Sequence, residues 1–277
     1  MKPSIYFLLI ALLLSTSLLK AQSPFDTNGQ FEFVEELPVQ EGLLYGPGRL
    51  HTKGKFFLTG MDDENTMITR IYKISMKDYA SLQLIEVEVN STDMSIYQPV
   101  MDSRGKTMIV AASTSDSWAD NDLYEARQNA NGQYGPLKKL DALNDTQVAD
   151  AYPWLSAKGK SIYYTRDSEL FFGKRSSLDA DFSVGQVVAF AGENTSNIMS
   201  SWLPKNRKEI YFVNSAGEIW RAKRIDDLHF ESPTLFTDEF TTLDFISSIS
   251  FDKKMKNLWM YLSDEENITH ILHYRLK

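Results

Sequence analysis

The stretch Trp154-Leu155-Ser156-Ala157-Lys158-Gly159-Lys160-Ser161-Ile162-Tyr163-Tyr164 joins two β-rich runs through a short Gly-Lys turn. Apolar, aromatic and β-branched runs bounded by turn residues are typical of β-strands. Related turns recur along the chain at separations of 51, 54, 48 and 47 residues, a period close to that of one four-stranded propeller blade. The five turns are Gly54-Lys55, Gly105-Lys106, Gly159-Lys160, Arg207-Lys208 and Lys253-Lys254.

A second pattern follows each turn: a polar residue, an aliphatic, an aromatic, a variable residue and a small or aliphatic one. Together with the runs on either side of the turn, this segment predicts three strands in every repeat. A more variable fourth segment completes four of the repeats. The second pattern occurs at Arg70–Ile74, Asp122–Arg127, Glu169–Lys174, Glu218–Lys223 and, most loosely, His270–Arg275.

The N-terminal region offers the strand that the fifth repeat lacks. Asn28-Gly29-Gln30-Phe31 closely repeats Asn131-Gly132-Gln133-Tyr134, which leads into the fourth segment of the second repeat. A strand at residues 30–38 would therefore complete the last blade and leave it without an open edge.

The sequence thus predicts an all-β fold, a five-bladed β-propeller favoured over a six-bladed one, whose last blade is closed by the N-terminal strand. One domain is expected, because a single all-β domain of this length is ordinary. The expected blades span residues 44–90, 94–145, 149–192, 197–238 and 243–277, with the closing strand at 30–38.

The third repeat resembles the WD-like propeller repeat of periplasmic TolB-type proteins. The resemblance rests on Pro153–Tyr164 and the later Glu169-Leu170-Phe171; Pro99 and Gly105-Lys106 repeat part of it, and no repeat has the full Ser-Pro-Asp-Gly of that family. The chain is therefore similar to a divergent member. The resemblance implies a propeller, and it implies roles such as protein binding, a place in the cell envelope or regulation of a peptidase.

The first 21 residues predict a secretory signal peptide, with Lys2, an apolar run from Ile5 to Leu19, and a cleavage point after Ala21. The apolar run is shorter than a membrane-spanning helix requires. The mature protein would then comprise residues 22–277, would be exported to the periplasm or secreted, and would have no stable membrane insertion.

Composition narrows the possible chemistry. The chain has no cysteine, which excludes disulfides, thiolate zinc sites and a cysteine nucleophile. A formal net charge of −8 without a basic run argues against nucleic acid as a partner. No phosphate-binding glycine loop, Gly-x-Ser-x-Gly elbow or His-Glu-x-x-His motif occurs, and no cofactor is expected.

Three carboxylates, Asp93, Asp150 and Asp244, each precede the innermost strand of a blade. Some five-bladed propellers are glycoside hydrolases that place carboxylates around the central opening. These three residues are the catalytic candidates if the protein is an enzyme. Their distances from the following turn differ, which favours ordinary turn residues.

Aromatic side chains also occur at the start of the inner strands. Large amphipathic rings concentrate binding energy, so a shared rim of them suits contact with a protein or a carbohydrate. Packing between blades is the alternative, and it is favoured for the two tryptophans. The binding candidates are Tyr45, Tyr97, Tyr152, Trp154 and Trp202.

Clusters of acidic residues follow the second strands of several blades. Calcium prefers hard oxygen ligands, but none of these clusters has the spaced ligand loop, and solvated turns explain them better. His270 and His273 project to opposite faces of a strand and should not share a metal. No metal site is therefore predicted, with Asp62, Asp63, Asp116, Asp120 and Asp122 as weak calcium candidates.

These patterns favour an exported, non-catalytic binding module that recognises a cell-envelope protein or peptide, and possibly a carbohydrate, across the mouth of the channel. The alternative is a carbohydrate-active enzyme that uses the channel-mouth carboxylates. The residues lining the central channel should distinguish the two functions, because a glycosidase needs converging carboxylates.

Overall fold

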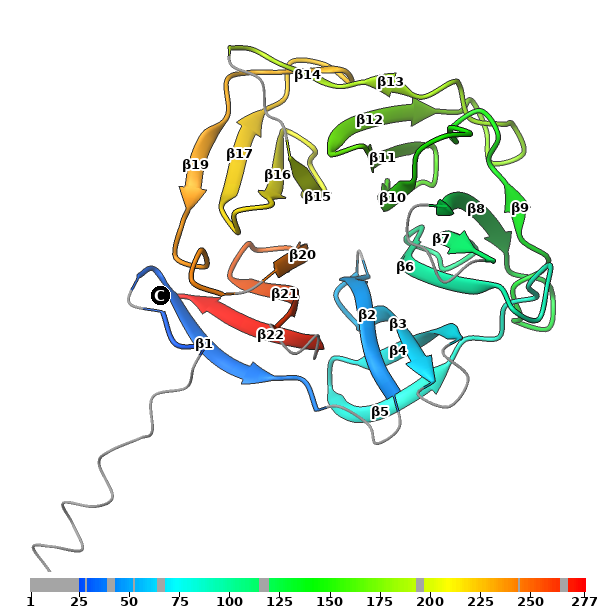
Figure 1. Ribbon diagram of the computed structural model, residues 1–277, viewed down its shortest axis with the longest axis horizontal. Helices are drawn as coiled ribbons and strands as arrows, with labels where there is room; N and C mark the ends of the chain where they lie inside the picture. The colour runs from blue at the N-terminus through cyan, green and yellow to red at the C-terminus, as the bar shows by residue number, and fades with distance from the viewer. Residues whose placement is uncertain are drawn as a thin grey trace, which may run out of the picture.

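The computed structural model describes residues 25–27, 29–38, 43–51, 53–63, 68–114, 120–192, 197–243, 245–264 and 269–277, and only the backbone of residues 43–45 and 63. These residues form five four-stranded antiparallel sheets arranged around a central axis, a five-bladed β-propeller (Figure 1). The predicted fold class is therefore confirmed. The predicted signal peptide, residues 1–21, lies outside the described residues.

In the first four blades the strands follow chain order from the innermost to the outermost, whereas the outermost strand of the fifth blade is β1 (Phe31–Glu36). The first contains β2 (Leu43–Leu50), β3 (Phe56–Asp63), β4 (Thr69–Ser75) and β5 (Asp78–Leu84). The second contains β6 (Ser95–Met101), β7 (Thr107–Ser113), β8 (Asp122–Arg127) and β9 (Lys138–Lys139). The third contains β10 (Asp150–Leu155), β11 (Ser161–Arg166), β12 (Glu169–Lys174) and β13 (Gln186–Val187).

The fourth blade contains β15 (Ile198–Trp202), β16 (Glu209–Asn214), β17 (Ile219–Lys223) and β19 (Thr234–Thr237). The fifth contains β20 (Phe245–Phe251), β21 (Asn257–Ser263), β22 (Thr269–Leu276) and β1 (Phe31–Glu36). A short parallel pair, β14 (Ala189–Phe190) with β18 (His229–Phe230), connects the third and fourth blades.

The N-terminal strand closes the ring as the sequence predicts. β1 pairs antiparallel with β22, from Phe31 opposite Leu276 to Glu36 opposite Leu272. The Phe31 side chain is fully buried and its ring lies 5.4 Å from that of Phe240 in the fourth blade's final loop. Closure therefore combines backbone pairing with apolar packing.

Five equivalent turns connect each inner strand to the second strand. In each turn a backbone N–H donates to the carbonyl three residues earlier, and its residue has a left-handed φ between 52° and 69° that favours glycine. The turn residues are Gly54, Gly105, Gly159, Arg207 and Met255. The predicted fifth pair, Lys253-Lys254, was therefore wrong: without a glycine to mark the left-handed position, the sequence left its place ambiguous, and the equivalent pair is Met255-Lys256.

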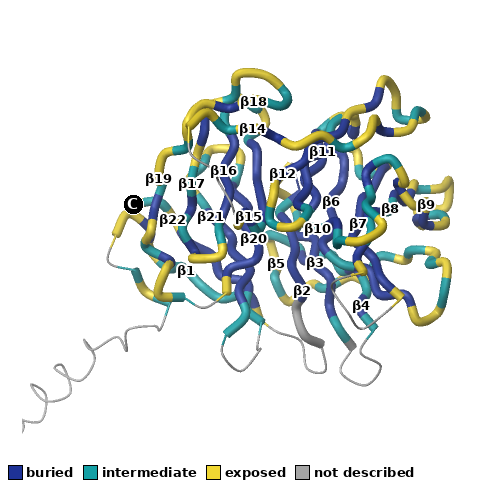
Figure 2. Tube along the Cα trace, turned by 45° about the horizontal axis from the view of Figure 1, so that its top comes forward, coloured by how far each residue is buried: buried dark blue, intermediate teal, exposed yellow. Residues whose placement is uncertain are grey.

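These turns follow the ends of the inner strands and define one end of the channel, here called the turn end. The inner strands begin at the opposite end, here called the mouth end. Figure 2 shows that burial is concentrated in the inner strands, whereas the outer loops are exposed.

The outer strands of the second and third blades are shorter than their sequence segments suggest. β9 and β13 contain two residues each, although the segments 135–140 and 185–190 were expected to be extended. In the third blade the chain leaves the sheet after Val187, and Ala189 and Phe190 pair with β18 of the next blade. That pairing brings the Phe190 ring to within 5.3 Å of Phe212.

A buried ion pair joins the second and third blades at the turn end. Arg175 donates from Nη1 and Nη2 to the Glu125 carboxylate at 2.8 and 3.0 Å, and from Nε to the Gly159 carbonyl. Its guanidinium also lies 4.3 Å from the centre of the Phe182 ring. The pair is fully hydrogen-bonded, which is the condition under which a buried charge is tolerated.

Among the described residues no helix is long and apolar enough to cross a membrane.

Candidate binding site at the channel mouth

All five inner strands have a register irregularity near the mouth end. An extra residue makes the strand bend locally and turns its side chains in a new direction, and such bulges are common beside functional sites. Gln98 and Tyr152 occupy two of these irregularities with a φ of 50°, and each precedes a proline. The irregularities lie between Tyr45 and Gly48, Tyr97 and Val100, Ala151 and Trp154, Ile198 and Ser200, and Ile246 and Ser248.

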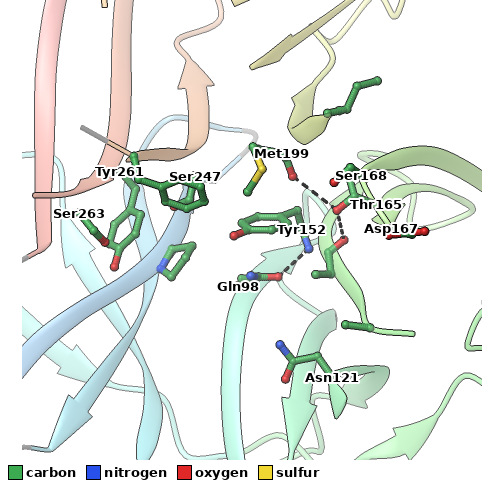
Figure 3. A pocket seen from close by; sticks show the side chains of 15 residues that line it. Gln98, Asn121, Tyr152, Thr165, Asp167, Ser168, Met199, Ser247, Tyr261 and Ser263 are labelled. Atoms are coloured by element: carbon green, nitrogen blue, oxygen red, sulfur yellow. Dashed lines mark hydrogen bonds between the residues drawn. The ribbon is translucent and has the colours of Figure 1, made fainter. Parts of the chain in front are cut away.

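A pocket of about 430 Å³ opens at this end, and every blade contributes to it (Figure 3). Uncharged polar and apolar side chains predominate in its lining, and Asp167 is the one carboxylate among the described residues that line it. Its walls include Pro47, Gln98, Asn121, Tyr152, Thr165, Asp167, Ser168, Ile198, Met199, Phe245, Ser247, Tyr261 and Ser263.

Two buried amides in this pocket have unused hydrogen-bonding capacity. Gln98 and Asn121 are each 2% exposed. Gln98 Oε1 accepts a hydrogen bond from the Tyr152 backbone N–H at 2.6 Å, but Gln98 Nε2 has no partner among the described residues. Neither Asn121 Nδ2 nor Asn121 Oδ1 has one there. Unsatisfied buried polar atoms are costly in a folded protein, so these amides favour a site completed by a ligand.

Arg49 reaches across the channel from the first blade and lies against the pocket residue Tyr152. Its guanidinium donates to the backbone carbonyls of Ser201 at 2.5 Å and Tyr152 at 3.3 Å. Burial lowers the pKa of Arg49 to about 9, because the charged form loses solvation. The side chain nevertheless remains positively charged near neutral pH.

Two tyrosines form the aromatic part of the site. Burial raises the pKa of Tyr152 to about 12 and also raises that of Tyr261. Both hydroxyls therefore stay protonated and can donate a hydrogen bond at neutral pH. In Figure 3 the Tyr152 ring lies across the pocket, between Met199 and Gln98.

Of the three predicted catalytic carboxylates, neither Asp93 nor Asp150 lines the pocket. Asp150 begins β10 and is buried, but its carboxylate binds Arg166 Nε at 2.8 Å and the Asp145 backbone N–H at 2.7 Å. Asp93 is exposed and accepts a hydrogen bond from the Ser91 hydroxyl. Asp244 lies outside the described residues. Burial raises the pKa of Asp150, although Arg166 opposes that effect.

The predicted binding aromatics have different positions. Tyr152 lines the pocket, whereas Tyr97 is partly buried and packs beside a cluster between the second and third blades. Trp154 and Trp202 are buried, and each packs edge-on against its cross-strand neighbour in the same blade, Tyr163 or Tyr211. The Trp202 ring also lies 5.3 Å from that of Phe251 in the fifth blade, which is the packing between blades that the sequence favoured. The Tyr45 side chain lies outside the described residues.

The weak calcium candidates form no cluster in the described residues, where no group of three potential metal ligands comes together. Asp62 accepts a hydrogen bond from the Thr69 hydroxyl, and Asp122 pairs with Lys139 at 2.5 Å. Asp120 lines no part of the pocket. Asp116 and the Asp63 side chain lie outside the described residues.

The two histidines of β22 contact the closing strand β1. His270 Nδ1 lies 2.6 Å from Glu36 Oε1, and His273 Nδ1 lies 3.1 Å from Glu35 Oε1. Each histidine therefore contacts a different carboxylate of β1.

Sequence reasoning missed Gln98, Asn121 and Arg49. A usable signal for Gln98 was present, because Gly46-Pro47, Gln98-Pro99 and Tyr152-Pro153 occupy equivalent places in three inner strands. Proline is rare inside paired strands, so its recurrence marks the bulges. Arg49 and Asn121 have no comparable repeated signal.

Comparisons with known proteins establish the fold alone. No protein-family model matches the chain, and a search of curated proteins finds no related sequence. The solved Dos1 propeller aligns with 89% of this chain and 55% of its own length, at 13% identity and a TM-score of 0.44. A puromycin hydrolase aligns with 87% of this chain and 37% of its own length, at 10% identity and a TM-score of 0.51. This chain thus spans less than two thirds of either protein.

Proposed function

We propose that this protein is a non-catalytic binding module that takes a peptide or a segment of a cell-envelope protein into the pocket at the channel mouth. The observation that supports it most strongly is the pair of buried amides, Gln98 and Asn121, which line the pocket and have polar atoms without a partner among the described residues: Gln98 Nε2 and both side-chain polar atoms of Asn121. A peptide backbone offers both donors and acceptors, so it can complete such groups.

The remaining lining suits the same ligand. Met199, Ile198 and Phe245 supply apolar surface, and Tyr152 and Tyr261 supply rings with a polar tip. Small-molecule and peptide sites commonly combine apolar walls with a few well-placed polar groups. The five blades form a rigid frame that presents these side chains without a large ordering cost.

Selection from a display library of random nine-residue segments tests this function. Segments enriched on the wild-type protein should bind the Asn121→Leu and Gln98→Leu variants at least 10-fold more weakly. A matched control is Asn131→Leu, which changes an exposed asparagine in a loop of the same blade. Equal binding to Asn121→Leu and the wild type would place the ligand elsewhere and remove the basis of the proposal.

The alternative, a carbohydrate-active enzyme, depends on Asp150. Its carboxylate is engaged by Arg166 and does not line the pocket, where Asp167 is the one carboxylate among the described lining residues. A panel of oligosaccharides provides the test. Hydrolysis that disappears in Asp150→Asn would establish the enzyme and reject the binding module.

The proposed location is the periplasm or the exterior of the cell, which agrees with the predicted signal peptide and the resemblance to TolB-type repeats. N-terminal sequencing of the protein produced in a bacterial host with an intact export pathway should find Gln22 as the first residue of the mature chain. A chain that keeps Met1 and stays in the cytoplasm would contradict this location.

A further inference from the structure

Arg49 is a buried cation without an acidic partner. Its side chain binds two carbonyl oxygens, and no carboxylate lies within 4.0 Å of it in the described part of the chain. Carbonyl dipoles satisfy its N–H groups but do not neutralise its charge. Buried charges are normally paired, so an unpaired one beside a pocket favours a ligand of opposite charge.

Arg49 and Gln98 bind the two backbone polar groups of the same residue, Tyr152. Gln98 Oε1 binds the Tyr152 N–H at 2.6 Å, and Arg49 Nη2 binds the Tyr152 carbonyl at 3.3 Å. Because the first bond fixes the orientation of the Gln98 amide, Nε2 is left as a donor without a partner in the described part of the chain. A donor without a partner and an uncompensated positive charge therefore lie on either side of one pocket residue.

The neighbouring acidic groups compensate this charge only weakly. Asp150 is paired with Arg166, and Asp167 lies in an exposed hairpin turn where water screens it. The charge of Asp62 also contributes to the raised pKa of Tyr261. Asp62 accepts a hydrogen bond from the Thr69 hydroxyl, and burial raises the pKa of Asp62, which favours its neutral form.

The pocket also has apolar lining residues. Ile198 and Met199 come from the fourth blade and Phe245 from the fifth, while Pro47 comes from the first. A ligand that fills the site should thus carry an oxygen anion next to an apolar group. A peptide that ends in an apolar residue has this arrangement, with its terminal carboxylate one bond from the Cα of the last side chain.

We propose that the pocket binds the C-terminal carboxylate of a peptide whose last side chain is apolar, with the unpartnered Gln98 and Asn121 amides donating hydrogen bonds and Arg49 supplying the compensating charge. This inference rests on the proposed peptide-binding function and specifies its ligand.

Calorimetric titration with N-acetylated pentapeptides ending in Leu, Phe or Val tests it. Each peptide is compared as the free acid, as the C-terminal amide, and as an amide that carries Glu at the fourth position. Free acids should bind at least 10-fold more tightly than both amides. Tight binding of the glutamate amides alone would assign the site to an internal carboxylate and overturn the inference.

Variants of Arg49 separate the charge from the fold. Arg49→Gln should bring the ratio of acid to amide affinity close to one, whereas Arg49→Lys should retain a preference for the acid. Thermal unfolding checks that both variants fold. If Arg49→Gln does not fold, the comparison of acid with amide on Arg49→Lys and on Gln98→Leu still decides the matter, because loss of the Gln98 donor should also reduce the ratio.

The outcomes distinguish the two proposals. Equal binding of acid and amide to the wild type overturns the carboxylate inference and leaves peptide binding intact. Absence of binding by every peptide overturns both. N-acetylphenylalanine serves as the small-molecule probe, and its binding as tightly as the pentapeptides would overturn the assignment to a peptide.

Discussion

The turn end and the mouth end of the channel differ in whether their buried polar side chains have hydrogen-bond partners. At the turn end, Asp102 Oδ1 accepts hydrogen bonds from the backbone N–H groups of Lys106 and Thr107, and Ser156 Oγ accepts from those of Lys160 and Ser161. At the mouth end, buried Gln98 and Asn121 retain polar atoms for which the described residues offer no partner. The fold itself satisfies the hydrogen bonds of these polar groups at the turn end, whereas those at the mouth end are left for a ligand.

This difference indicates where the repeat constrains the sequence. A turn that occurs five times with the same hydrogen bond serves the scaffold, and its side chains are selected for local geometry. The mouth end has the same bulged frame in all five blades but different side chains in each. Substitutions at the turn end should therefore change stability, and those at the mouth end should change binding.

The largest effect should come from Arg175→Ala at the turn end. The change leaves the buried Glu125 carboxylate without its bidentate partner, which should lower the free energy of unfolding by about 3–5 kcal/mol. Arg127→Ala is the matched control, because Arg127 is a half-exposed partner of the same carboxylate and should cost less than about 1 kcal/mol. Chemical denaturation measures both, and equal losses would show that burial of the pair is unimportant.

Asp102→Ala should have the next largest effect. The Asp102 side chain is fully buried and accepts hydrogen bonds from two backbone N–H groups. Its removal should lower the free energy of unfolding by about 2–3 kcal/mol. Asp102→Asn keeps one acceptor oxygen and should lose less. Peptide affinity should stay unchanged in any folded variant, so a large change in affinity would contradict the separation of the two ends.

Asn121→Leu at the mouth end should increase the stability of the protein instead of lowering it. Replacement of an unpartnered buried amide by an apolar side chain of similar size should raise the free energy of unfolding by about 1 kcal/mol while it abolishes binding. A loss of stability of similar size would mean that Asn121 belongs to the scaffold.

Gly54→Ala isolates the backbone contribution of a repeated turn. No atom lies within 4 Å of the Cβ that the change would add, so the cost should come only from the φ of +66°, about 1 kcal/mol. Thermal unfolding compared with Gly135→Ala, where φ is not positive and the nearest atom is 3.6 Å away, provides the control. Equal stability of the two variants would show that the turn tolerates any residue.

The smallest effect concerns pH. Burial lowers the pKa of His273 from its ordinary value of 6.5, although Glu35 opposes the shift. Below pH 6.5 the unfolded chain therefore takes up a proton that the folded chain resists, and stability should fall as the pH decreases toward the folded pKa. His273→Gln should show a smaller decrease between pH 7 and pH 5 in denaturation experiments, and identical pH profiles would contradict this assignment.

The sequence was sufficient for the fold because the fold is repeated. Five related turns and a matching pair of Asn-Gly-Gln segments predicted both the blades and the closing strand. It failed at Met255, where an unusual residue occupies the left-handed position, and at β9 and β13, where the chain leaves the sheet early. In the third blade the segment after β13 pairs instead with β18 of the next blade.

The candidate site was predicted only in its location. The expectation that function lies on the mouth side of the inner strands identified Tyr152. The candidate residues were chosen as carboxylates or aromatic residues, which excluded the amides Gln98 and Asn121. Whether a buried amide has a partner depends on distances between different blades, such as the bond from Tyr152 to Gln98. Residues 54 positions apart meet there, and no local pattern records that contact.

The most direct test of the proposed division between the two ends is to follow the side-chain amide NMR signals of Gln98 and Asn121 during titration with an N-acetylated pentapeptide acid ending in Phe. Both signals should shift and saturate together, while the backbone signals of Gly54, Gly105 and Gly159 at the turn end stay in place. Shifts that cluster at the turn end, or side-chain amides that remain unchanged at saturation, would contradict the assignment of the mouth end as the binding site.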